Sequence, residues 1–499
     1  MSERYDVVVV GGGNAGYCAA HAALEVTDRV LLLEKAPEAW AGGNSYFTAG
    51  VFRCAVESLD EAVDLIEDRD DARLAATDLP RYTRSDFLAD LRRVTEGRCD
   101  PELAGVLVDE ATDTVRWLRT KGLRFRLAWD RQSFLVDGRH RFWGGLYVGT
   151  VGGGKGLVAQ HQSAASAAGL RVRYEHAVVG LLTRPDGAIA GVGCDTPGGR
   201  VQVEAGAVVL AAGGFEANPM LRAGYLGPGW DLARVRGTPY NTGEALMAAI
   251  GAGAAPAGNW SGCHSTAWDA AAPPTGDREL TNLLTRQSYP LGLIVNSGGE
   301  RFVDEGADYR NYTYAKYGAA ILRQPGALAF QLFDAQTEPL LRQDEYTAPG
   351  VSRAEAGSVR ELAGRLGIDP DGLERTVAAY NAAIEPGPFD PSVKDGKRTR
   401  GLVPPKSNWA LPLERPPFLG FAVTCGITFT FGGLRVDADA RVLDRQDRPI
   451  PGLTAAGELV GGLFWHNYPG GSGLSAGAVL GRRAGLSAAR HASRSIRAG

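Results

Sequence analysis

The stretch YDVVVVGGGNAG, residues 5–16, decides the fold of this chain. Its β-branched run 7–10 is typical of a strand buried on both faces of a parallel sheet, and the Ala-rich stretch 15–24 has the spacing of a helix. A second apolar run at 30–33 predicts the next parallel strand. The three segments together predict a β-α-β unit of about 30 residues.

The turn between the first strand and the helix carries the chemistry of this unit. Gly11, Gly13 and Gly16 form G-x-G-x-x-G, a pattern typical of a backbone turn that receives a pyrophosphate. Glu34 follows 18 residues after Gly16, at the end of the second strand, where a carboxylate accepts hydrogen bonds from ribose hydroxyls. An acid at this place favours FAD or NAD over NADP, for which Arg is the usual residue.

Glycine-rich turns recur along the chain, which has 67 Gly in 499 residues. FAD is a long cofactor that needs close backbone approach along its whole length, so the recurrence favours FAD over NAD. Any one doublet alone would indicate only a turn. There is no second strand-G-x-G-x-x-G-helix pattern for an NADPH domain, so we expect electrons to pass to a partner protein, a quinone or oxygen. The recurring turns lie at 42–43, 152–154, 213–214 and 470–473.

Composition excludes several classes of protein. With 44% apolar and 22% charged residues, the chain is neither collagen-like nor disordered, and a net charge of -4 without long charge runs makes nucleic acid an unexpected partner. The six cysteines form no C-x-x-C pair, which predicts no metal site and indicates reduced thiols in a cytoplasm. No apolar run approaches the roughly 18 residues of a membrane span. We therefore expect a soluble cytoplasmic protein.

The fold class expected from these patterns is α/β, with a Rossmann-like domain that holds a parallel sheet and a smaller antiparallel sheet. A helical excursion is predicted at about 56–122, and strands return between 171 and 211, with 201–203 and 207–211 as separate strands. Residues 256–395 differ from the preceding sequence in containing Pro and Ala tracts between predicted strands and a helix. This pattern predicts an inserted α+β domain. The first domain would then comprise 1–255 and 396–499.

At this point the sequence resembles a known family, the fumarate reductase/succinate dehydrogenase flavoproteins, over essentially its whole length. Within that superfamily it looks closest to the FAD-dependent tricarballylate dehydrogenases, through residues 11–15 and 466–471. The motifs that carry the resemblance, besides the first glycine turn, are Gly42-Gly43-Asn44-Ser45, Ala211-Ala212-Gly213-Gly214-Phe215-Glu216, Val295-Asn296-Ser297-Gly298-Gly299-Glu300-Arg301-Phe302, Ala456-Gly457-Glu458 and Pro469-Gly470-Gly471-Ser472-Gly473.

The resemblance implies that FAD lies extended across the first domain and that 256–395 caps the substrate against the flavin ring. Residues 472–474 would lie near that ring at the start of the last helix, whose positive end favours a reduced, anionic flavin. Succinate dehydrogenases attach FAD through a His where this chain has Asn44, so we expect noncovalent FAD. Together the motifs and the resemblance assign to the cofactor Gly11, Gly13, Asn14, Ala15, Gly16, Glu34, Lys35, Gly42, Gly43, Asn44, Ser45, Gly153, Gly154, Val178, Ala211, Ala212, Gly213, Gly243, Glu244, Glu458, Ser472, Gly473 and Leu474.

Oxidation of a C–C bond next to a carboxylate needs a hydride acceptor, a base, and cations or dipoles that hold the carboxylate. By resemblance, Arg310 is the acid/base residue; its ordinary pKa above ~12 means that it needs a relay. The alternative is a surface Arg in a polar loop. Tyr468 is a second proton-handling candidate, as in the related ketosteroid dehydrogenases, whereas Arg301 is expected to be structural.

His264 resembles the substrate-binding His of the family, although Ser265 replaces the usual Pro; a structural His is the alternative. Phe429 and Tyr468 stand where fumarate reductases have a His and an Arg, and the upstream Glu of their relay has no clear counterpart. Fumarate or succinate is therefore disfavoured, and the aromatic side chains suit a larger or less charged substrate unless they simply pack the sheet. The substrate-binding candidates are His264, Thr266, Arg286, Thr428, Phe429 and His466.

The main hypothesis is an FAD-dependent dehydrogenase or reductase that transfers hydride between FAD and a C–C bond next to a carboxylate or carbonyl. Tricarballylate is the substrate implied by resemblance. One alternative is a desaturase or reductase of a ring or specialised metabolite. The other is a noncatalytic binding protein with an FAD-type fold.

Overall fold

The computed structural model describes residues 4–498, and its first layer is an eight-stranded sheet. β1 (Tyr5–Val10) pairs in parallel with β2 (Val30–Leu33) and β12 (Gly199–Leu210), as the β-α-β pattern predicted. The strand order is β10-β11-β12-β1-β2-β9, and β20 pairs with β12 and β19. The remaining strands are β9 (Arg171–Arg173), β10 (Ala177–Thr183), β11 (Ile189–Thr196), β19 (Arg441–Leu443) and β20 (Pro449–Ala455).

One prediction about this sheet was wrong. Residues 201–203 and 207–211 do not form two strands, because β12 runs without a break from Gly199 to Leu210. Its first half pairs antiparallel with β11 and its second half in parallel with β1. The expected parallel sheet and smaller antiparallel sheet are therefore both present, and one strand joins them, which confirms the predicted fold class.

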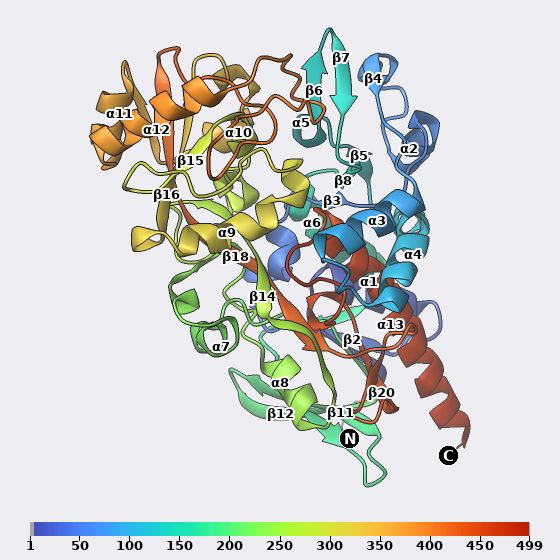
Figure 1. Ribbon diagram of the computed structural model, residues 1–499. Coiled ribbons are helices and arrows are strands. Elements are labelled where there is room, and N and C mark those ends of the chain that lie inside the picture. The colour runs from blue at the N-terminus through green and yellow to red at the C-terminus, as the bar shows by residue number, and fades with distance from the viewer. Residues whose placement is uncertain (1–3, 499) are drawn as a thin grey trace.

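Three helices pack together beside this sheet: α1 (Asn14–Leu24), α4 (Pro101–Thr120) and α13 (Ser472–Ala498) (Figure 1). The approach of α13 to α1 depends on glycine. A Cβ on Gly481 would lie 2.5 Å from the carbonyl oxygen of Ala15, and one on Gly485 would lie 2.1 Å from that of Ala19. The last helix of the chain therefore lies directly on the helix that begins at the first glycine turn.

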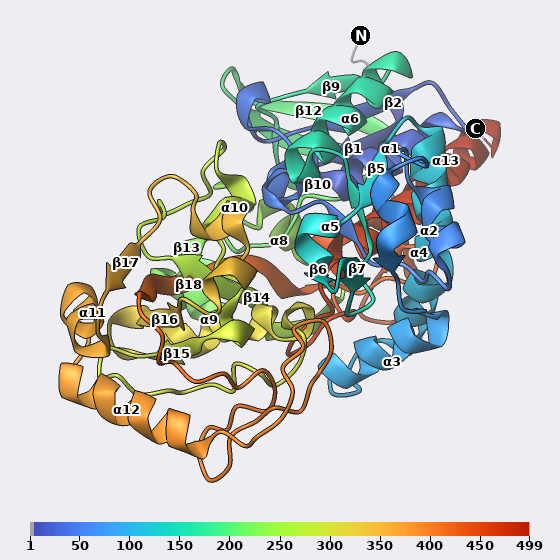
Figure 2. The same cartoon turned by 90° about the horizontal axis from the view of Figure 1, so that it is seen from above.

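The second sheet has the order β13-β18-β16-β15, and β14 and β17 also pair with β18. Figure 2 shows α11 and α12 at the end of this sheet that is far from the first sheet. The inserted segment predicted at 256–395 supplies β14 to β17, but the sheet extends beyond it, because its central strand β18 lies at 418–434. The members are β13 (Arg234–Val235), β14 (Pro256–Asp269), β15 (Leu293–Val295), β16 (Leu328–Asp334), β17 (Arg353–Ala356) and β18 (Phe418–Leu434), with α9 (Tyr314–Leu322), α11 (Val359–Leu366) and α12 (Pro370–Ala383).

The predicted helical excursion contains α2 (Leu59–Leu65), α3 (Arg84–Val94) and α4. α3 begins with a capping box, in which the Thr83 side chain accepts from the backbone N–H of Asp86 and the Asp86 carboxylate accepts from that of Thr83. After this segment, the β6–β7 hairpin and α5 lie next to α10 (Figure 1). The further elements are β3 (Val51–Phe52), β4 (Thr77–Asp78), β5 (Phe125–Leu127), α5 (Trp129–Gln132), β6 (Ser133–Val136), β7 (Arg139–Phe142), β8 (Val148–Thr150), α6 (Gly153–Ala167), α7 (Pro219–Leu221), α8 (Glu244–Gly251) and α10 (Gln343–Tyr346).

The sequence indicated reduced thiols and no membrane-spanning segment, and the structure can be compared with both expectations. All six cysteines are free and buried. Within residues 4–498, no helix has both the length and the apolar character needed to cross a membrane.

Candidate active site

A long cavity begins at the carboxyl ends of β1, β2 and β12 and reaches the junction with the second sheet. This is the edge at which open α/β sheets bind their ligands. Of the residues predicted from the sequence, those that line the cavity are Gly11, Gly13, Asn14, Ala15, Glu34, Lys35, Gly43, Asn44, Ser45, Val178, Ala211, Ala212, Gly213, Gly243, Glu244, Glu458, Gly473 and Leu474, together with His264, Arg310, Thr428, Phe429 and Tyr468.

The first end of the cavity is built by the glycine turn. Gly11 has φ +103°, in the region that favours glycine, and a Cβ on Gly16 would lie 1.9 Å from the carbonyl oxygen of Gly11, so the helix packs directly on the turn. The Glu34 carboxylate fixes the same turn, since its Oε2 accepts from the Gly12 N–H at 2.7 Å and its Oε1 from the Ala36 N–H at 2.8 Å. Burial nevertheless raises the pKa of Glu34. The start of α1 and the Glu34 carboxylate thus fit the pyrophosphate and ribose of a dinucleotide.

The second glycine turn is fixed by the side chain of Asn44. Its Nδ2 donates to Glu216 Oε1 and to the Thr428 carbonyl oxygen, both at 2.6 Å, and its Oδ1 accepts from the Thr238 N–H at 2.8 Å. These bonds tie the turn to both sheets. An amide nitrogen is not a nucleophile, so the residue fits the prediction of noncovalent FAD.

Two buried carboxyl groups, Glu216 and Glu458, stand behind this turn. Asn241 Nδ2 donates to Glu216 Oε1 at 2.6 Å, and the Thr430 N–H donates to Glu458 Oε1 at 2.7 Å. Burial raises the pKa of both, and proximity to Glu216 adds to the rise at Glu458, whose pKa lies well above its usual value. Burial and the neighbouring carboxyl group thus favour the neutral form of Glu458.

The far end of the cavity brings together His264, Tyr314, Phe429 and Tyr468. The hydroxyl oxygens of Tyr314 and Tyr468 are 2.5 Å apart, and the His264 ring meets both tyrosine rings edge-on at 4.9 and 5.0 Å. Phe429 stacks on Tyr468 with ring centroids 6.3 Å apart. Within the described residues, neither ring nitrogen of His264 has a hydrogen-bond partner, and burial together with Arg236 lowers the pKa of His264 well below its usual value. The imidazole is therefore neutral.

Arg236 also lines this end, and sequence analysis missed it. It follows β13 directly, and its guanidinium donates to Thr428 Oγ1 at 3.0 Å and to Asn282 Oδ1. No ion pair of Arg236 occurs among residues 4–498, although the side chain is buried. The Arg236-Gly237-Thr238 stretch matches no motif. Only the pairing of β13 with β18 brings Arg236 beside Thr428, so the sequence offers no signal for it.

Arg310 lies in the cavity wall and is only 8% exposed. Its Nη1 donates to Gln287 Oε1 at 2.7 Å and its Nη2 to the Arg131 carbonyl oxygen at 2.6 Å, and its guanidinium lies 5.0 Å from the Trp143 ring centroid. Burial and the nearby guanidinium groups of Arg342 and Arg131 lower the pKa of Arg310 well below its usual range. This environment makes release of a proton easier than for an exposed arginine.

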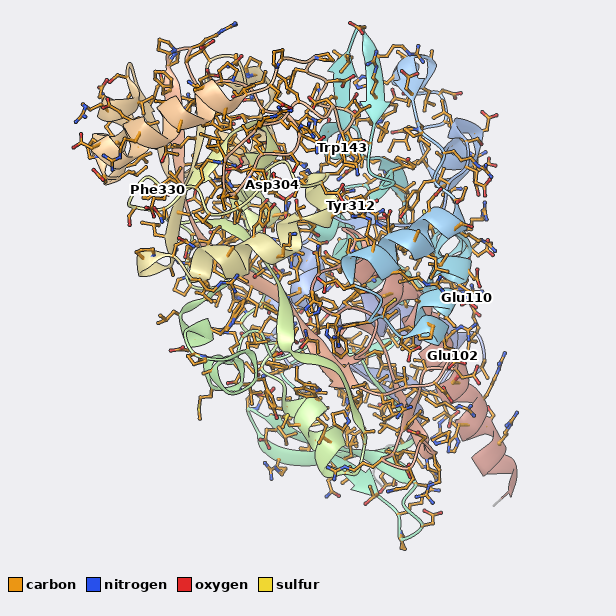
Figure 3. All side chains as sticks on the ribbon, in the orientation of Figure 1. Glu102, Glu110, Trp143, Asp304, Tyr312 and Phe330 are labelled. Atoms are coloured by element: carbon orange, nitrogen blue, oxygen red, sulfur yellow. The ribbon has the colours of Figure 1, made fainter. Side chains whose placement is uncertain are left out.

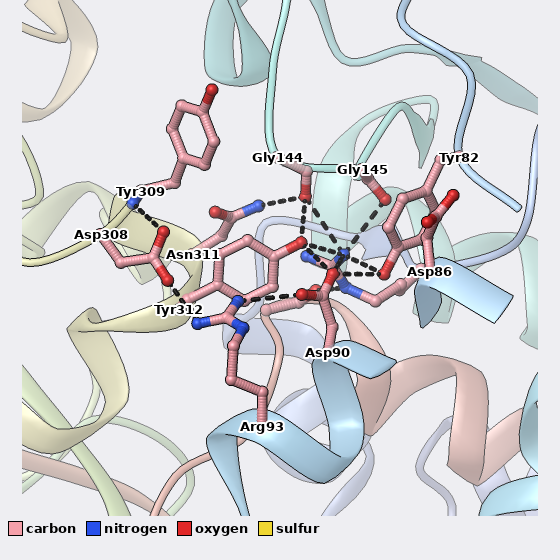
Figure 4. Close-up of polar contacts among 12 residues, drawn as sticks. Tyr82, Asp86, Asp90, Arg93, Gly144, Gly145, Asp308, Tyr309, Asn311 and Tyr312 are labelled. Atoms are coloured by element: carbon pink, nitrogen blue, oxygen red, sulfur yellow. Dashed lines mark hydrogen bonds and ion pairs between the residues drawn. The ribbon is translucent and has the colours of Figure 1, made fainter. Parts of the chain in front are cut away.

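The loop that carries Arg310 is held from several sides (Figure 4). Arg93 of α3 pairs with Asp308 at 2.5 Å, and Tyr312 donates to Asp90 Oδ2 at 2.5 Å. The fully buried Arg53 donates to Tyr312 Oη at 3.0 Å. In Figure 3, Tyr312 and Trp143 lie between the helical segment and the second sheet. The helical excursion therefore positions the Arg310 loop.

Several predicted residues do not line the cavity. Arg286 is fully buried elsewhere, where its Nη2 pairs with Asp269 at 2.8 Å. His466 is on the surface, 3.6 Å from Glu96, because the neighbouring Asn467 takes the inward position and donates to the Tyr312 carbonyl oxygen. The others that lie outside the lining are Gly16, Gly42, Gly153, Gly154, Thr266 and Ser472.

Glycines in this last group act through packing. A Cβ on Gly154 would lie 2.5 Å from the carbonyl oxygens of Ser45 and Tyr46. Gly154 therefore lets α6 support the second glycine turn from behind.

Comparisons with known proteins agree with this geometry. The family described as "FAD binding domain" matches residues 6–474. "Probable fumarate reductase Ifc3" of Shewanella frigidimarina is 30% identical over 500 residues, covering 98% of this chain and 76% of that protein. "Vinyl phenol reductase" of Lactiplantibacillus plantarum is 27% identical over 526 residues, covering 98% and 97%. The open conformation of a flavocytochrome c3 fumarate reductase superposes with a TM-score of 0.73 at 27% identity, covering 98% of this chain and 79% of that one.

The cofactor that these matches indicate is FAD, which agrees with the glycine turns, the Glu34 carboxylate and the length of the cavity. The chain belongs to the FAD binding domain family, among the fumarate reductase/succinate dehydrogenase flavoproteins, and is an FAD-dependent oxidoreductase.

Proposed function

We propose that the protein oxidises or reduces a substrate C–C bond that lies next to a carboxylate or carbonyl group. Bound FAD would supply the hydride acceptor or donor. The observation that carries the proposal is the pair of buried guanidinium groups, Arg236 and Arg310, at the far end of the cavity that begins with the dinucleotide turn. Buried cations of this kind are expected where an anionic substrate group binds.

Arg236 is suited to hold the substrate carboxylate. Thr428 and Asn282 orient its guanidinium, while its Nε has no hydrogen-bond partner in the described part of the chain. A substrate carboxylate would accept a hydrogen bond from Nε and would also supply the negative charge that Arg236 lacks nearby. Arg236 therefore anchors the substrate without taking part in proton transfer.

Arg310 and the tyrosine pair are suited to handle the proton. Arg310 has a lowered pKa, so it can exchange a proton with a substrate carbon more readily than an ordinary arginine. Burial and Tyr314 raise the pKa of Tyr468 well above its usual value, so Tyr468 remains a neutral donor. It would donate a hydrogen bond to the substrate carbonyl or carboxylate.

Tricarballylate, the substrate implied by the sequence resemblance, is the first candidate. Three arginines, Arg131, Arg236 and Arg310, line the cavity and would complement a polycarboxylate. The test is anaerobic mixing of the FAD-loaded protein with tricarballylate while the visible flavin band is recorded. Bleaching is expected, and a band that stays unchanged at saturating concentration would remove tricarballylate.

A ring or aryl substrate is the second candidate, favoured by the stacking of Phe429 on Tyr468 and by the edge-on contact of Phe464 with Tyr468 at 5.2 Å. The similar vinyl phenol reductase is named for an aromatic substrate. The same anaerobic experiment with cyclic enones and aryl-substituted acrylates distinguishes the two classes. Bleaching or reoxidation by these compounds, with none by polycarboxylates, would establish the second candidate.

A noncatalytic role is tested by purification alone. A colourless protein that takes up no added FAD would support it, and a yellow protein whose flavin turns over would exclude it. The cytoplasmic location and the electron acceptor, whether a protein, a quinone or oxygen, stay predictions.

A further inference from the structure

A second cavity of about 490 Å³ lies beside the first, between the β6 segment and the loop that leads into α10. The two cavities share Arg131, Gln287 and Arg310 in their walls, so Arg310 stands at the boundary between them. A volume of this size is typical of a site for a small molecule. None of the cofactor motifs lies in its wall.

The second cavity carries an excess of buried positive charge. Arg131 and Arg342 converge on one fully buried carboxylate, since Glu345 Oε1 lies 2.6 Å from Arg131 Nη2 and 3.3 Å from Arg342 Nε. Arg310 adds a third guanidinium to the same wall. The other nearby carboxylate belongs to the exposed Asp344, whose Oδ2 lies 3.5 Å from Arg131 Nη1. Buried charge of one sign is costly without a counter-ion, so the cluster is suited to an anion.

Two buried donors in this wall lack an acceptor. Arg342 Nη2 and Trp143 Nε1 have no hydrogen-bond partner anywhere in residues 4–498, and the Arg342 side chain is only 8% exposed. A buried donor without an acceptor destabilises the folded protein. An oxyanion bound beside Arg342 would accept from a guanidinium that the chain itself leaves unsatisfied.

The rest of the wall is largely aromatic. Phe134 stacks on Trp143 at 6.2 Å, and Trp143 stacks on Tyr309 at 5.6 Å, with the ring planes 24° and 21° apart. Trp409 continues the row at 6.0 Å from Tyr309. Together with Leu135 these side chains form an apolar, mostly aromatic wall next to the guanidinium cluster. Such a surface is suited to an aromatic ring.

We propose that the second cavity binds a planar aromatic carboxylate, with its carboxylate on Arg342 and its ring against the wall formed by Phe134, Trp143 and Trp409. This cavity is distinct from the one proposed for FAD and substrate, although Arg131, Gln287 and Arg310 stand in the walls of both. It does not depend on which substrate reacts in the first cavity.

The proposal is tested by calorimetric titration of the FAD-loaded protein with 2-naphthoate. Binding is expected at a site that depends on Arg342, so Arg342→Gln should weaken it about tenfold or more, because a charge-assisted hydrogen bond is lost. The neutral 2-naphthamide should also bind about tenfold more weakly. His264→Ala, which changes only the first cavity, should leave the affinity unchanged.

A variant at the cavity mouth separates loss of binding from loss of folding. Leu135 is 67% exposed, so substitution there does not disturb the core. Leu135→Glu should weaken 2-naphthoate binding about threefold or more through charge repulsion, and the matched Leu135→Gln should bind like the unaltered protein. Affinity as high as in the unaltered protein in both Arg342→Gln and Leu135→Glu would overturn the proposal, and so would loss of binding in His264→Ala. Failure of the proposed redox function would alter none of these affinities.

Discussion

The two buried arginines at the substrate end differ in what surrounds them. Both arginines donate to neutral acceptors and burial lowers the pKa of both, but Arg342 and Arg131 help to lower that of Arg310 well below its usual range. Arg236, whose Nε has no partner in the described residues, is suited to hold an anion, and Arg310, beside other cations, is suited to lose a proton. The chemistry of each residue therefore follows from its neighbours.

Arg236→Gln should raise the dissociation constant of a carboxylate substrate about 10- to 100-fold, because one charge-assisted hydrogen bond is lost. The rate of flavin reduction at saturation should change much less, since the anchor does not transfer the proton. Stopped-flow titration separates the two quantities. Arg360→Gln, on the surface, serves as the matched control, and an unchanged dissociation constant in Arg236→Gln would contradict the assignment.

Two stacked histidines, His21 and His161, lie under the first glycine turn, and His161 Nε2 lies 3.1 Å from Asn14 Oδ1. Burial lowers the pKa of His21 from 6.5 to about 4. The folded state binds this proton more weakly than the unfolded state. The contribution of neutral His21 to the free energy of unfolding is therefore fully present above pH 6.5 and is lost as the pH falls through 4. The loss should reach about 3 kcal/mol.

Urea unfolding between pH 7 and pH 4.5 measures this dependence. His21→Gln should make the profile less steep over that window, with His161, whose pKa burial also lowers, still contributing, whereas the exposed His466→Gln should leave it unchanged. A profile in His21→Gln that is as steep as in the unaltered protein would exclude His21 as the cause.

At the scale of elements, the glycine turns depend on the helices that support them. Gly154→Ala should push α6 away from the carbonyl oxygens of Ser45 and Tyr46, displace the second turn and lower the affinity for FAD about tenfold or more. Gly105→Ala is the control, since it also lies in a helix but in open space, and it should stabilise α4 slightly. Fluorescence titration of the apoprotein with FAD gives both affinities, and equal values would refute the packing role.

Arg53 binds four other segments of the chain. Its Nε donates to the Gly470 carbonyl oxygen at 2.8 Å, and its Nη1 donates to the hydroxyls of Tyr82 and Tyr312 and to the carbonyl oxygens of residues 144–145. Arg53→Met should lower the free energy of unfolding by about 3 kcal/mol, because several buried acceptors lose their donor. Arg84→Met, at an exposed pair with Asp109, should change it by less than about 0.5 kcal/mol. Chemical denaturation of the two variants checks the difference.

Local patterns of the sequence were sufficient to predict β1, α1, β2 and α4, because buried runs, helical spacing and the Pro101 start are properties of short segments. They were not sufficient for β18, whose residues lie beyond 395 but pair with strands on the other side of that boundary. Pairing between segments far apart is set by the fold as a whole. The change in composition near residue 395 therefore gave no indication of this strand pairing.

In the whole molecule, the cavity extends from the first sheet to the second, and the chain contributes strands to these two sheets in alternation. The dinucleotide end follows from the glycine turns and was predictable for that reason. At the far end of the cavity, Arg236 comes from the residue directly after β13, Arg310 from the loop before α9, and Tyr468 from the loop before α13. The resemblance therefore predicted that Arg310 and Tyr468 lie in the site, and nothing in the sequence indicated Arg236. Arg286 and His466 were also expected in the site, but neither lines the cavity.

The most direct test of the central claim is a single-turnover reaction between the chemically reduced FAD-loaded protein and unsaturated carboxylates or enones, under anaerobic conditions. At least one such compound should restore the oxidised flavin band. Arg310→Lys should slow this step about 100-fold while FAD stays bound. Reoxidation at the same rate in Arg310→Lys, or no reoxidation by any compound with a C=C bond next to a carboxylate or carbonyl, would contradict the proposed redox function.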